Sequence, residues 1–469
     1  MLAQGGINSL WFDGENDYVN CGNDTSLNLT EQLTIEAWVK GYIGSTYARI
    51  VDKYNYFAKQ GFNLVRIPST NGVMLDFWAT DGSKHVCGTS KIVFDEQWHY
   101  VAATFDGTQV KMYVDGRLED TLNTGDKLIQ LCPYDLRIGN GFDGNMWFPF
   151  WGYIDEVRIW NAALDSLTIC NWTHKKVTSG HPYLSNLVGS WRFNEGSGTI
   201  AGDTSGTGNH GVLTNMDSTS CWFASTAPFA SNLTDTLLNV SACWASMDSN
   251  FSSIFSIEDN DISGDDCIIF GHSDAELSWI DTDVPSNLGV ANRLNRIWRM
   301  EVYDTLAGTI IFDLADLGVN DGNGLKLLYD SNTEFADADT SHGVFDPANL
   351  IFRVSQQEFK HEYYYTLGTT ENIALIEQET INQSNILCIH SYPNPLTTST
   401  TQSYTLDKPR NVQFTVYNVQ SQIVFSMQEK QDKGEQQIQW NAEGLPAGMY
   451  YYRIQAGDMA GSGKMVKMQ

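Results

Sequence analysis

The chain has 469 residues, and 56 acidic side chains against 28 Lys and Arg give it a formal net charge of −28. Such an acidic chain is unsuited to nucleic acid, which proteins bind through clustered Lys and Arg, and no run of roughly 18 apolar residues predicts a membrane-spanning helix. The 40 Gly, the 12% of aromatic residues and the small number of Pro favour an all-β protein, and the length favours about three domains.

Residues 8–160 are made of short β-type segments separated by turn signals. In the segment 33–40, apolar residues occupy every second position, as on the buried face of a strand: Leu33, Ile35, Ala37 and Val39. The dipeptides Asp106-Gly107 and Asp115-Gly116 are typical of hairpin turns. Many short strands with this spacing predict a β-sandwich or jelly roll rather than helices packed on a parallel sheet.

Four segments of this stretch carry a family resemblance and follow one another in the order that the family has: LWFDGENDYVNCG (10–22), LTIEAWVK (33–40), WHYVAATFDGTQVKMYVDG (98–116) and GYIDEVRIWNAAL (152–164). With a Gly-, Asp- and Asn-rich segment at 187–215, they make residues 1–229 resemble a laminin-G-like jelly roll of the concanavalin type. The resemblance implies a sandwich of two sheets, often with a bound calcium ion, that binds glycans or extracellular partners.

The next segment, residues 230–372, is also β-rich but far more acidic. Short apolar runs such as CIIFGH (267–272) are separated by Asp, Asn and Gly, and predict an accessory β-sandwich. This segment resembles the domain found beside laminin-G-like domains in surface proteins of Bacteroidetes. Residues 231–375 hold 24 acidic and 6 basic side chains, so divalent cations are possible partners, and a solvated acidic surface is the alternative. Residues 373–387 are a predicted linker.

The last segment, residues 388–469, resembles the C-terminal sorting domain (type A) that the type IX secretion system reads. The similar pieces are, in chain order, YPNP (392–395), VQFTVYNVQSQIV (412–424), LPAGMYYYRIQAG (445–457) and GKMVKMQ (463–469). The alternating strand Met449–Ile454 favours a small, Ig-like antiparallel sandwich. The resemblance implies that the type IX secretion machinery carries the protein across the outer membrane, and that it is secreted or held at the outer cell surface.

Acidic residues far apart in the first domain are candidates for a calcium site. Calcium takes about six to eight oxygen ligands, and Asp13 and Asp17 lie near Gly14, which lets the backbone bend so that its carbonyls can join them. The resemblance places the first and last strands side by side and so implies that Asp155 completes the site. The alternative is that Asp13 and Asp17 form an Asx turn while Asp155 pairs with Arg158.

A second calcium candidate lies at 259–266. Asp259 and Asp261 follow the opening of an EF-hand loop, D-x-D-x-S-G, and Asp265 comes shortly after them. The last position of such a loop is a bidentate Glu, whereas this chain has Phe270 there, so the EF-hand fails. We therefore expect a looser calcium-binding turn or none.

The segment 141–152, GFDGNMWFPFWG, gathers aromatic rings beside polar side chains. Flat rings stack on sugar faces, so Trp147 and Phe148 are candidates for a glycan platform, with Asp143 and Asn145 holding sugar hydroxyls. Phe150 is at a position that resembles a buried aromatic of the family and is expected in the core. The alternative is that alternate rings of the whole segment pack in the core.

The eight cysteines have no CxxC or His-containing metal spacing, so zinc is not expected. An even number scattered through an aromatic-rich β protein suits an oxidising compartment. Cys243 and Cys267 share the central segment and are a predicted disulfide, and the pairing of the others stays open. The first residues, MLAQGG, resemble the end of a secretion signal peptide.

Enzyme motifs in the chain fail on their context. GNGFDG (139–144) fits GxGxxG but lacks a following helix, and GHSDA (271–275) ends in Ala where a nucleophile elbow has Gly. The carboxylate spacings of concanavalin-type glucanases, E-x-D-x-x-E and E-x-D-x-E, do not occur. We therefore predict a non-enzymatic, adhesin- or lectin-like protein that binds glycans or another extracellular protein. The alternatives are a structural subunit of a surface polymer or matrix, and a polysaccharide-degrading hydrolase with an unrecognised carboxylate pair.

Overall fold

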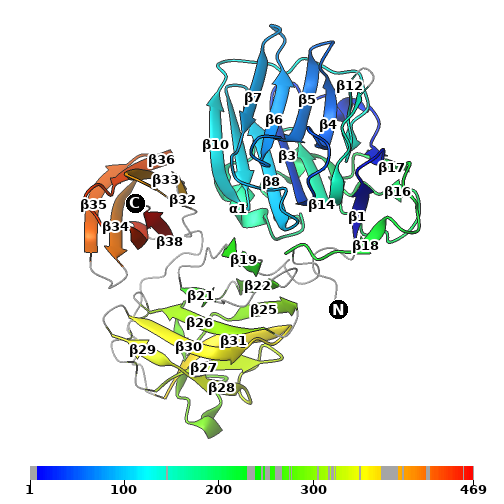
Figure 1. Ribbon diagram of the computed structural model, residues 1–469. Helices are drawn as coiled ribbons and strands as arrows, with labels where there is room; N and C mark the ends of the chain where they lie inside the picture. The colour runs from blue at the N-terminus through cyan, green and yellow to red at the C-terminus, as the bar shows by residue number, and fades with distance from the viewer. Residues whose placement is uncertain are drawn as a thin grey trace. The chain divides into compact units, whose positions relative to one another are not determined.

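Strands make up nearly all the regular structure, which confirms the predicted all-β class (Figure 1). The chain divides into two compact units, Met1–Ser231 and Asn232–Gln469. The α-helix α1 spans Ser166–Trp172, and within the described part of the chain no helix is both long and apolar enough to span a membrane. The computed structural model describes residues 8–143, 146–229, 238–244, 247–248, 254–258, 267–273, 275, 277–303, 306–314, 317, 319, 322, 324–347, 350–370, 389–392, 396–418, 423–457 and 459–467.

The first unit contains two large antiparallel sheets, which we call the β3 sheet and the β4 sheet. The β3 sheet consists, in spatial order, of β10 (Arg117–Asn123), β9 (Gln109–Val114), β8 (Trp98–Phe105), β3 (Leu33–Gly41), β14 (Trp151–Trp160), β1 (Asn8–Asp13) and β18 (Trp222–Ala224), with β15 (Leu187–Trp191) paired to β14. The β4 sheet consists of β16 (Ile200–Ala201), β17 (Gly211–Thr214), β2 (Tyr18–Asn20), β11 (Arg137–Ile138), β4 (Arg49–Asn55), β5 (Gln60–Arg66), β6 (Val73–Trp78) and β7 (Lys84–Gly88).

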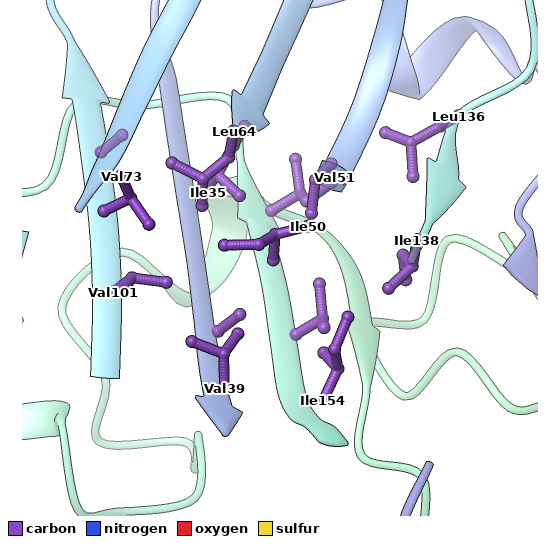
Figure 2. Close-up of a cluster of buried hydrophobic side chains, with 14 of the residues drawn as sticks. Ile35, Val39, Ile50, Val51, Leu64, Val73, Val101, Leu136, Ile138 and Ile154 are labelled. Carbon is purple, nitrogen blue, oxygen red and sulfur yellow. The ribbon is translucent and has the colours of Figure 1, made fainter. Parts of the chain in front are cut away.

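The core lies between these two sheets. Figure 2 shows Ile35 and Val39 of β3 facing Val51 and Leu64 of the β4 sheet, and all four side chains are fully buried. The predicted alternation along β3 is therefore confirmed, because the face of Leu33, Ile35, Ala37 and Val39 is the core face. Burial of an aliphatic side chain of this size stabilises the fold by roughly 1.5–3 kcal/mol.

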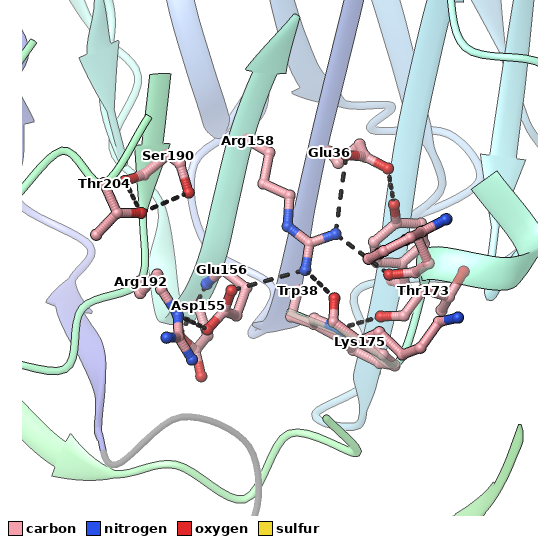
Figure 3. Close-up of polar contacts among 12 residues, drawn as sticks. Glu36, Trp38, Asp155, Glu156, Arg158, Thr173, Lys175, Ser190, Arg192 and Thr204 are labelled. Carbon is pink, nitrogen blue, oxygen red and sulfur yellow. Dashed lines mark hydrogen bonds and ion pairs between the residues drawn. The ribbon is translucent and has the colours of Figure 1, made fainter. Parts of the chain in front are cut away.

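The outer face of the β3 sheet is buried as well, by α1 and the segment after it. Asp165 caps the start of α1 by accepting from Thr168 N at 2.7 Å. Arg158 on β14 donates to the carbonyls of Trp172 (3.2 Å) and Lys175 (2.6 Å), which end or follow that helix. Figure 3 shows this polar layer, in which charged groups of the sheet hold the covering segment in place.

Glu36 is the centre of that layer. Its carboxylate is fully buried, accepts from Trp160 Nε1 at 2.6 Å and from the hydroxyl of Tyr100, and lies 4.0 Å from the Arg158 guanidinium. Glu156 adds a second acidic contact to Arg158, at 3.7 Å. The strand positions between the core residues of β3 are thus as buried as the core itself, although they carry polar groups.

The second unit begins with a β-sandwich that covers the predicted accessory domain. One described sheet has β20 (Met247–Asp248), β19 (Leu238–Trp244), β22 (Cys267–His272), β25 (Trp298–Tyr303), β31 (Tyr363–Thr369), β24 (Asn292–Leu294), β23 (Trp279–Ile280), β27 (Leu325–Asp330) and β28 (Asp339–His342). The other has β21 (Phe255–Glu258), β26 (Ala307–Asp313), β30 (Ile351–Glu358) and β29 (Val344–Asp346). Phe255, Trp298 and Phe312 form an aromatic core cluster between them.

The C-terminal part is a smaller sandwich. One described sheet has β32 (His390–Tyr392), β33 (Ser399–Leu406) and β36 (Gly434–Asn441), and the other has β35 (Ile423–Gln431), β34 (Arg410–Asn418), β37 (Gly448–Ala456) and β38 (Met459–Lys467). In β37, Tyr450, Tyr452 and Ile454 are buried in the core while Tyr451 is exposed. The alternation predicted for this strand is therefore confirmed.

Candidate functional site

A short hairpin, β12 (Phe142–Asp143) and β13 (Met146–Trp147), follows β11 and lies on the outer face of the β4 sheet. Backbone bonds fix its base: Arg49 N donates to Phe148 O at 3.0 Å, and Phe148 N donates to Gly141 O at 3.0 Å. A Cβ on Gly141 would lie 2.7 Å from side-chain atoms of Arg49 and Asp52, so only glycine lets the hairpin approach the sheet this closely.

The hairpin presents an aromatic cluster, here called the aromatic platform, made of Tyr18, Phe142 and Trp147. The Trp147 ring stacks on Tyr18 with centroids 5.8 Å apart and lies 4.7 Å from Phe142. Trp147 is nevertheless 42% exposed and Phe142 37% exposed. Arg137 of β11 packs against the platform, with its guanidinium carbon 5.1 Å from the Tyr18 centroid and 5.5 Å from that of Trp147.

The other aromatic residues of the segment point elsewhere. Phe148 is half-buried, and its ring packs on the Arg49 guanidinium at 4.9 Å. Phe150 is fully buried and packs edge-to-face on Phe12, which confirms its predicted place in the core. The side chains of Asp143 and Asn145, predicted to hold sugar hydroxyls, lie outside the described residues.

A row of polar residues crosses the sheet beneath the platform. Strand register aligns them from β2 to β6, on the face opposite the core: Asn20, Arg137, Asp52, Asn63 and Asp76. Asp76 accepts from Tyr54 OH at 3.2 Å and pairs with Lys84 at 2.8 Å. Burial raises the pKa of Asp76, and the Lys84 ammonium opposes that shift. Asn63 is fully buried and its amide atoms have no partner among the described residues.

The carboxylates predicted to bind calcium are not assembled. Asp17 accepts from Asp13 N at 3.0 Å, and burial raises the pKa of Asp17 to about 6. In the β1–β14 pairing, Asp13 lies opposite Trp151, so Asp155 is four residues, about 13 Å, further along β14. The set therefore does not fit a calcium site, and no group of three metal-ligating side chains occurs among the described residues.

Asp155 instead has a structural environment of its own. It is fully buried, and its carboxylate accepts from Ser225 Oγ at 2.6 Å and from Glu156 N at 2.8 Å. The pairing with Arg158 considered above does not form either, because Arg158 contacts Glu36 and Glu156. The acidic residues of the second calcium candidate, Asp259, Asp261 and Asp265, lie outside the described residues.

The cysteines of the first unit are buried. Cys21, Cys87 and Cys221 are free thiols in its core, and burial raises the pKa of Cys221 to about 11. Thiolates are therefore scarce at these positions and the thiols are unreactive while the fold is closed. The predicted Cys243–Cys267 disulfide involves a side chain, that of Cys243, outside the described residues.

Three residues of the site were not predicted from the sequence: Tyr18, Phe142 and Arg137. Phe142 had a usable signal, because two residues separate Asp143 from Met146 and a hairpin with that loop pairs Phe142 with Trp147. Tyr18 and Arg137 had none, because they meet Trp147 through sheet pairings between segments far apart in the sequence.

Two family models match parts of this chain. Residues 13–170 match the concanavalin A-like lectin/glucanases superfamily, and residues 390–468 match the secretion system C-terminal sorting domain. The fold and these matches define a secreted all-β protein built around a concanavalin A-like domain. Its sorting domain further makes it a substrate of the type IX secretion system, bound for the cell surface or the extracellular space.

Solved structures are similar to parts of the chain. A putative carbohydrate-binding protein from Bacteroides ovatus is 17% identical with a TM-score of 0.37, and the match covers 49% of this chain and 62% of that one, less than two thirds of its length. The CBM40 domain of Ruminococcus gnavus IT-sialidase is 19% identical (TM-score 0.29; 35% of this chain, 97% of that one). Domains LG4-5 of the mouse laminin alpha1 chain are 13% identical (TM-score 0.27; 34% and 44%). No curated protein matches the chain.

Proposed function

We propose that this protein is a non-enzymatic glycan-binding protein that acts outside the cell, and that sugars stack on the aromatic platform. The observation that carries the proposal is that the Trp147 ring is 42% exposed although Tyr18 and Phe142 hold it on two sides. Because the ring is already oriented, stacking of a sugar on it orders little more of the protein. The match of residues 13–170 to a superfamily of lectins and glucanases supports a carbohydrate ligand.

The surroundings of Trp147 suit a sugar rather than a purely apolar partner. Phe142 and Met146, 37% and 57% exposed, extend the apolar surface along the hairpin, and such patches mark binding sites. Arg137 adds N–H donors next to the same rings, with its guanidinium carbon 5.5 Å from the Trp147 centroid. An aromatic surface with a polar group beside it matches the apolar face and the polar rim of a sugar ring.

Binding is better supported than hydrolysis, because the two acids of the polar row, Asp52 and Asp76, are paired with other side chains. Asp52 pairs with Arg49 at 3.4 Å, and Asp76 is held by Tyr54 and Lys84. Both side chains are buried beneath their partners. Glycoside hydrolysis needs two carboxyl groups that flank an accessible bond. An exported protein that turned over a panel of polysaccharides would contradict the proposal.

The sharpest test compares Trp147→Ala with Phe57→Ala. Phe57 is also an exposed aromatic residue, 68% exposed, but it lies in the turn beyond the end of β4 and away from the platform. On a glycan array and by calorimetry with the best ligand, we expect Trp147→Ala to weaken binding about tenfold or more, the loss of roughly 1.4 kcal/mol of stacking, and Phe57→Ala to leave it unchanged. Equal binding by both variants would refute the platform.

Calcium stays a separate prediction, because the acidic residues at 259–266 lie outside the described residues. The same calorimetry with and without a chelator tests whether calcium takes part. Loss of binding on chelation would place a metal in the function without assigning it to Asp13, Asp17 and Asp155.

A further inference from the structure

We propose that the aromatic platform selects anionic sugars, those with a carboxylate or sulfate group, and that Arg137 is the specificity-determining residue. This inference rests on the proposed function and adds a ligand class to it. It starts from the state of one side chain: among the described residues, Arg137 makes no ion pair and no side-chain hydrogen bond, and its guanidinium contacts the rings of Tyr18 and Trp147.

Other arginines of the same unit have polar or charged partners, although the Nε of Arg49, Arg66 and Arg158, like that of Arg137, is buried without a hydrogen bond. Arg49 pairs with Asp52, Arg66 donates to Ser45 O and Asn71 Oδ1, and Arg158 donates to two carbonyls between two carboxylates. Such pairing is the expected state in a chain with 56 acidic side chains and 28 Lys and Arg. Arg137, which has ring contacts but no ion pair or side-chain hydrogen bond to any described residue, therefore calls for a physical reason.

The residues beside Arg137 explain how it stays unpaired. Strand register puts Asn20 on one side of it and Asp52 on the other. Asp52 is turned to Arg49, at 3.4 Å, and Asn20 donates to Asp135 Oδ2 at 2.9 Å while its Oδ1 accepts from Gly22 N. Both neighbours thus have other partners, and no side chain that the structure describes accepts a hydrogen bond from the Arg137 guanidinium.

The rings orient that charge without neutralising it. Tyr18 and Trp147 lie 5.1 and 5.5 Å from the guanidinium carbon, within the range of a cation–π contact. A sugar that stacks on the exposed part of Trp147 brings its substituents within reach of the guanidinium. A planar fork of N–H donors matches the paired oxygens of a carboxylate or sulfate, and such charge-assisted bonds are stronger than those to a neutral hydroxyl.

The test uses two matched pairs of ligands on the full-length protein. One pair is an oligogalacturonate and its methyl ester, which differ in the carboxylate charge, and the other is a sulfated galactan oligosaccharide and its desulfated form. We expect the wild type to bind the charged member of at least one pair about tenfold more tightly, the value of one charge-assisted hydrogen bond, and the pair that shows the preference identifies the anionic group.

Variants of Arg137 distinguish a role in selecting charged ligands from a role in holding Trp147 in place. Arg137→Gln should abolish the preference, because it lowers the affinity for the charged member about tenfold more than the affinity for the neutral member. Arg137→Lys should keep part of the preference, and melting temperatures should confirm that both variants fold. The inference is overturned if Arg137→Gln weakens both members equally, since Arg137 then only supports Trp147, or if the wild type binds no charged member better. Trp147→Ala should weaken every member, and if it weakens none, the proposed function itself fails.

Discussion

Replacement of Arg158 by Met should destabilise the jelly roll strongly without touching the platform. Arg158 is 1% exposed and links four groups: the carbonyls of Trp172 and Lys175 and the carboxylates of Glu36 and Glu156. Methionine fills a similar volume but leaves Glu36 as an uncompensated buried charge. Breaking a buried pair in this way costs about 3–5 kcal/mol of unfolding free energy.

Buried thiols give an assay that reports on this unit alone in a chain of several domains. Cys87 and Cys221 lie in the jelly-roll core, so they react with a maleimide only when the unit opens, and peptide mass spectrometry assigns each label. A loss of about 3 kcal/mol raises the labelling rate roughly a hundredfold when reclosing is faster than labelling. Arg192→Met is the control, because Arg192 is only partly buried and its partner Glu156 keeps the contact with Arg158 when Arg192 is replaced, so we expect a smaller loss of stability.

The second variant tests the mechanism rather than the magnitude. In Glu36→Gln/Arg158→Met the uncompensated charge is gone, and the introduced amide oxygen can still accept from Trp160, so we expect the double variant to recover part of the stability lost in Arg158→Met. The reasoning is refuted if Arg158→Met labels no faster than Arg192→Met, or if the double variant labels as fast as Arg158→Met.

Two further predictions concern pH and export. Burial lowers the pKa of His99, but the charges and hydrogen bonds of Asp115 and Asp95 outweigh it and raise the pKa to about 9, from 6.5 in the unfolded chain. Protonated His99 therefore stabilises the folded state fully below pH 6.5, and this stabilisation is lost as pH rises through about 9. The melting temperature should fall over that interval in the wild type and fall less in His99→Gln. Parallel curves of melting temperature against pH for the two proteins would contradict the assignment. Deletion of residues 388–469 should retain the protein inside the cell, seen by fractionation and blotting, while a short control deletion within the predicted linker 373–387 should leave export normal. Export of the chain that lacks residues 388–469 would exclude a role for the sorting domain.

The sequence predicts the strands of this fold well, because the buried face of a strand shows as an alternation of apolar residues within a few positions. The alternation of Leu33, Ile35, Ala37 and Val39 identifies the core face of β3 correctly. It does not reveal that Glu36, on the other face, is equally buried, because the covering segment comes from residues beyond 160 and its contacts are polar. A hydrophobic pattern identifies buried apolar side chains, but it does not identify buried polar side chains whose hydrogen bonds are formed inside the protein.

The site is predicted less completely, because it depends on register. The prediction of Trp147 as an exposed ring rests on a local cluster, and the ring is exposed. The calcium set needed Asp155 to lie level with Asp13, and the register of β1 and β14 separates them by four residues. Neighbouring strands can be inferred from a family resemblance, whereas the offset between them is set by the packing of the whole sheet.

The two sheets differ in what their outer faces leave available, and two arginines show the difference. On the β3 sheet, Arg158 donates hydrogen bonds to carbonyls of the covering segment. The polar groups of that face therefore stabilise the fold. On the β4 sheet, Arg137 is left to aromatic rings beside an exposed Trp147. The ligand that we propose is therefore expected on the β4 sheet, where Arg137 lies beside the exposed ring of Trp147. Substitutions at Arg158 should change stability and leave ligand preference alone, and substitutions at Arg137 should do the reverse.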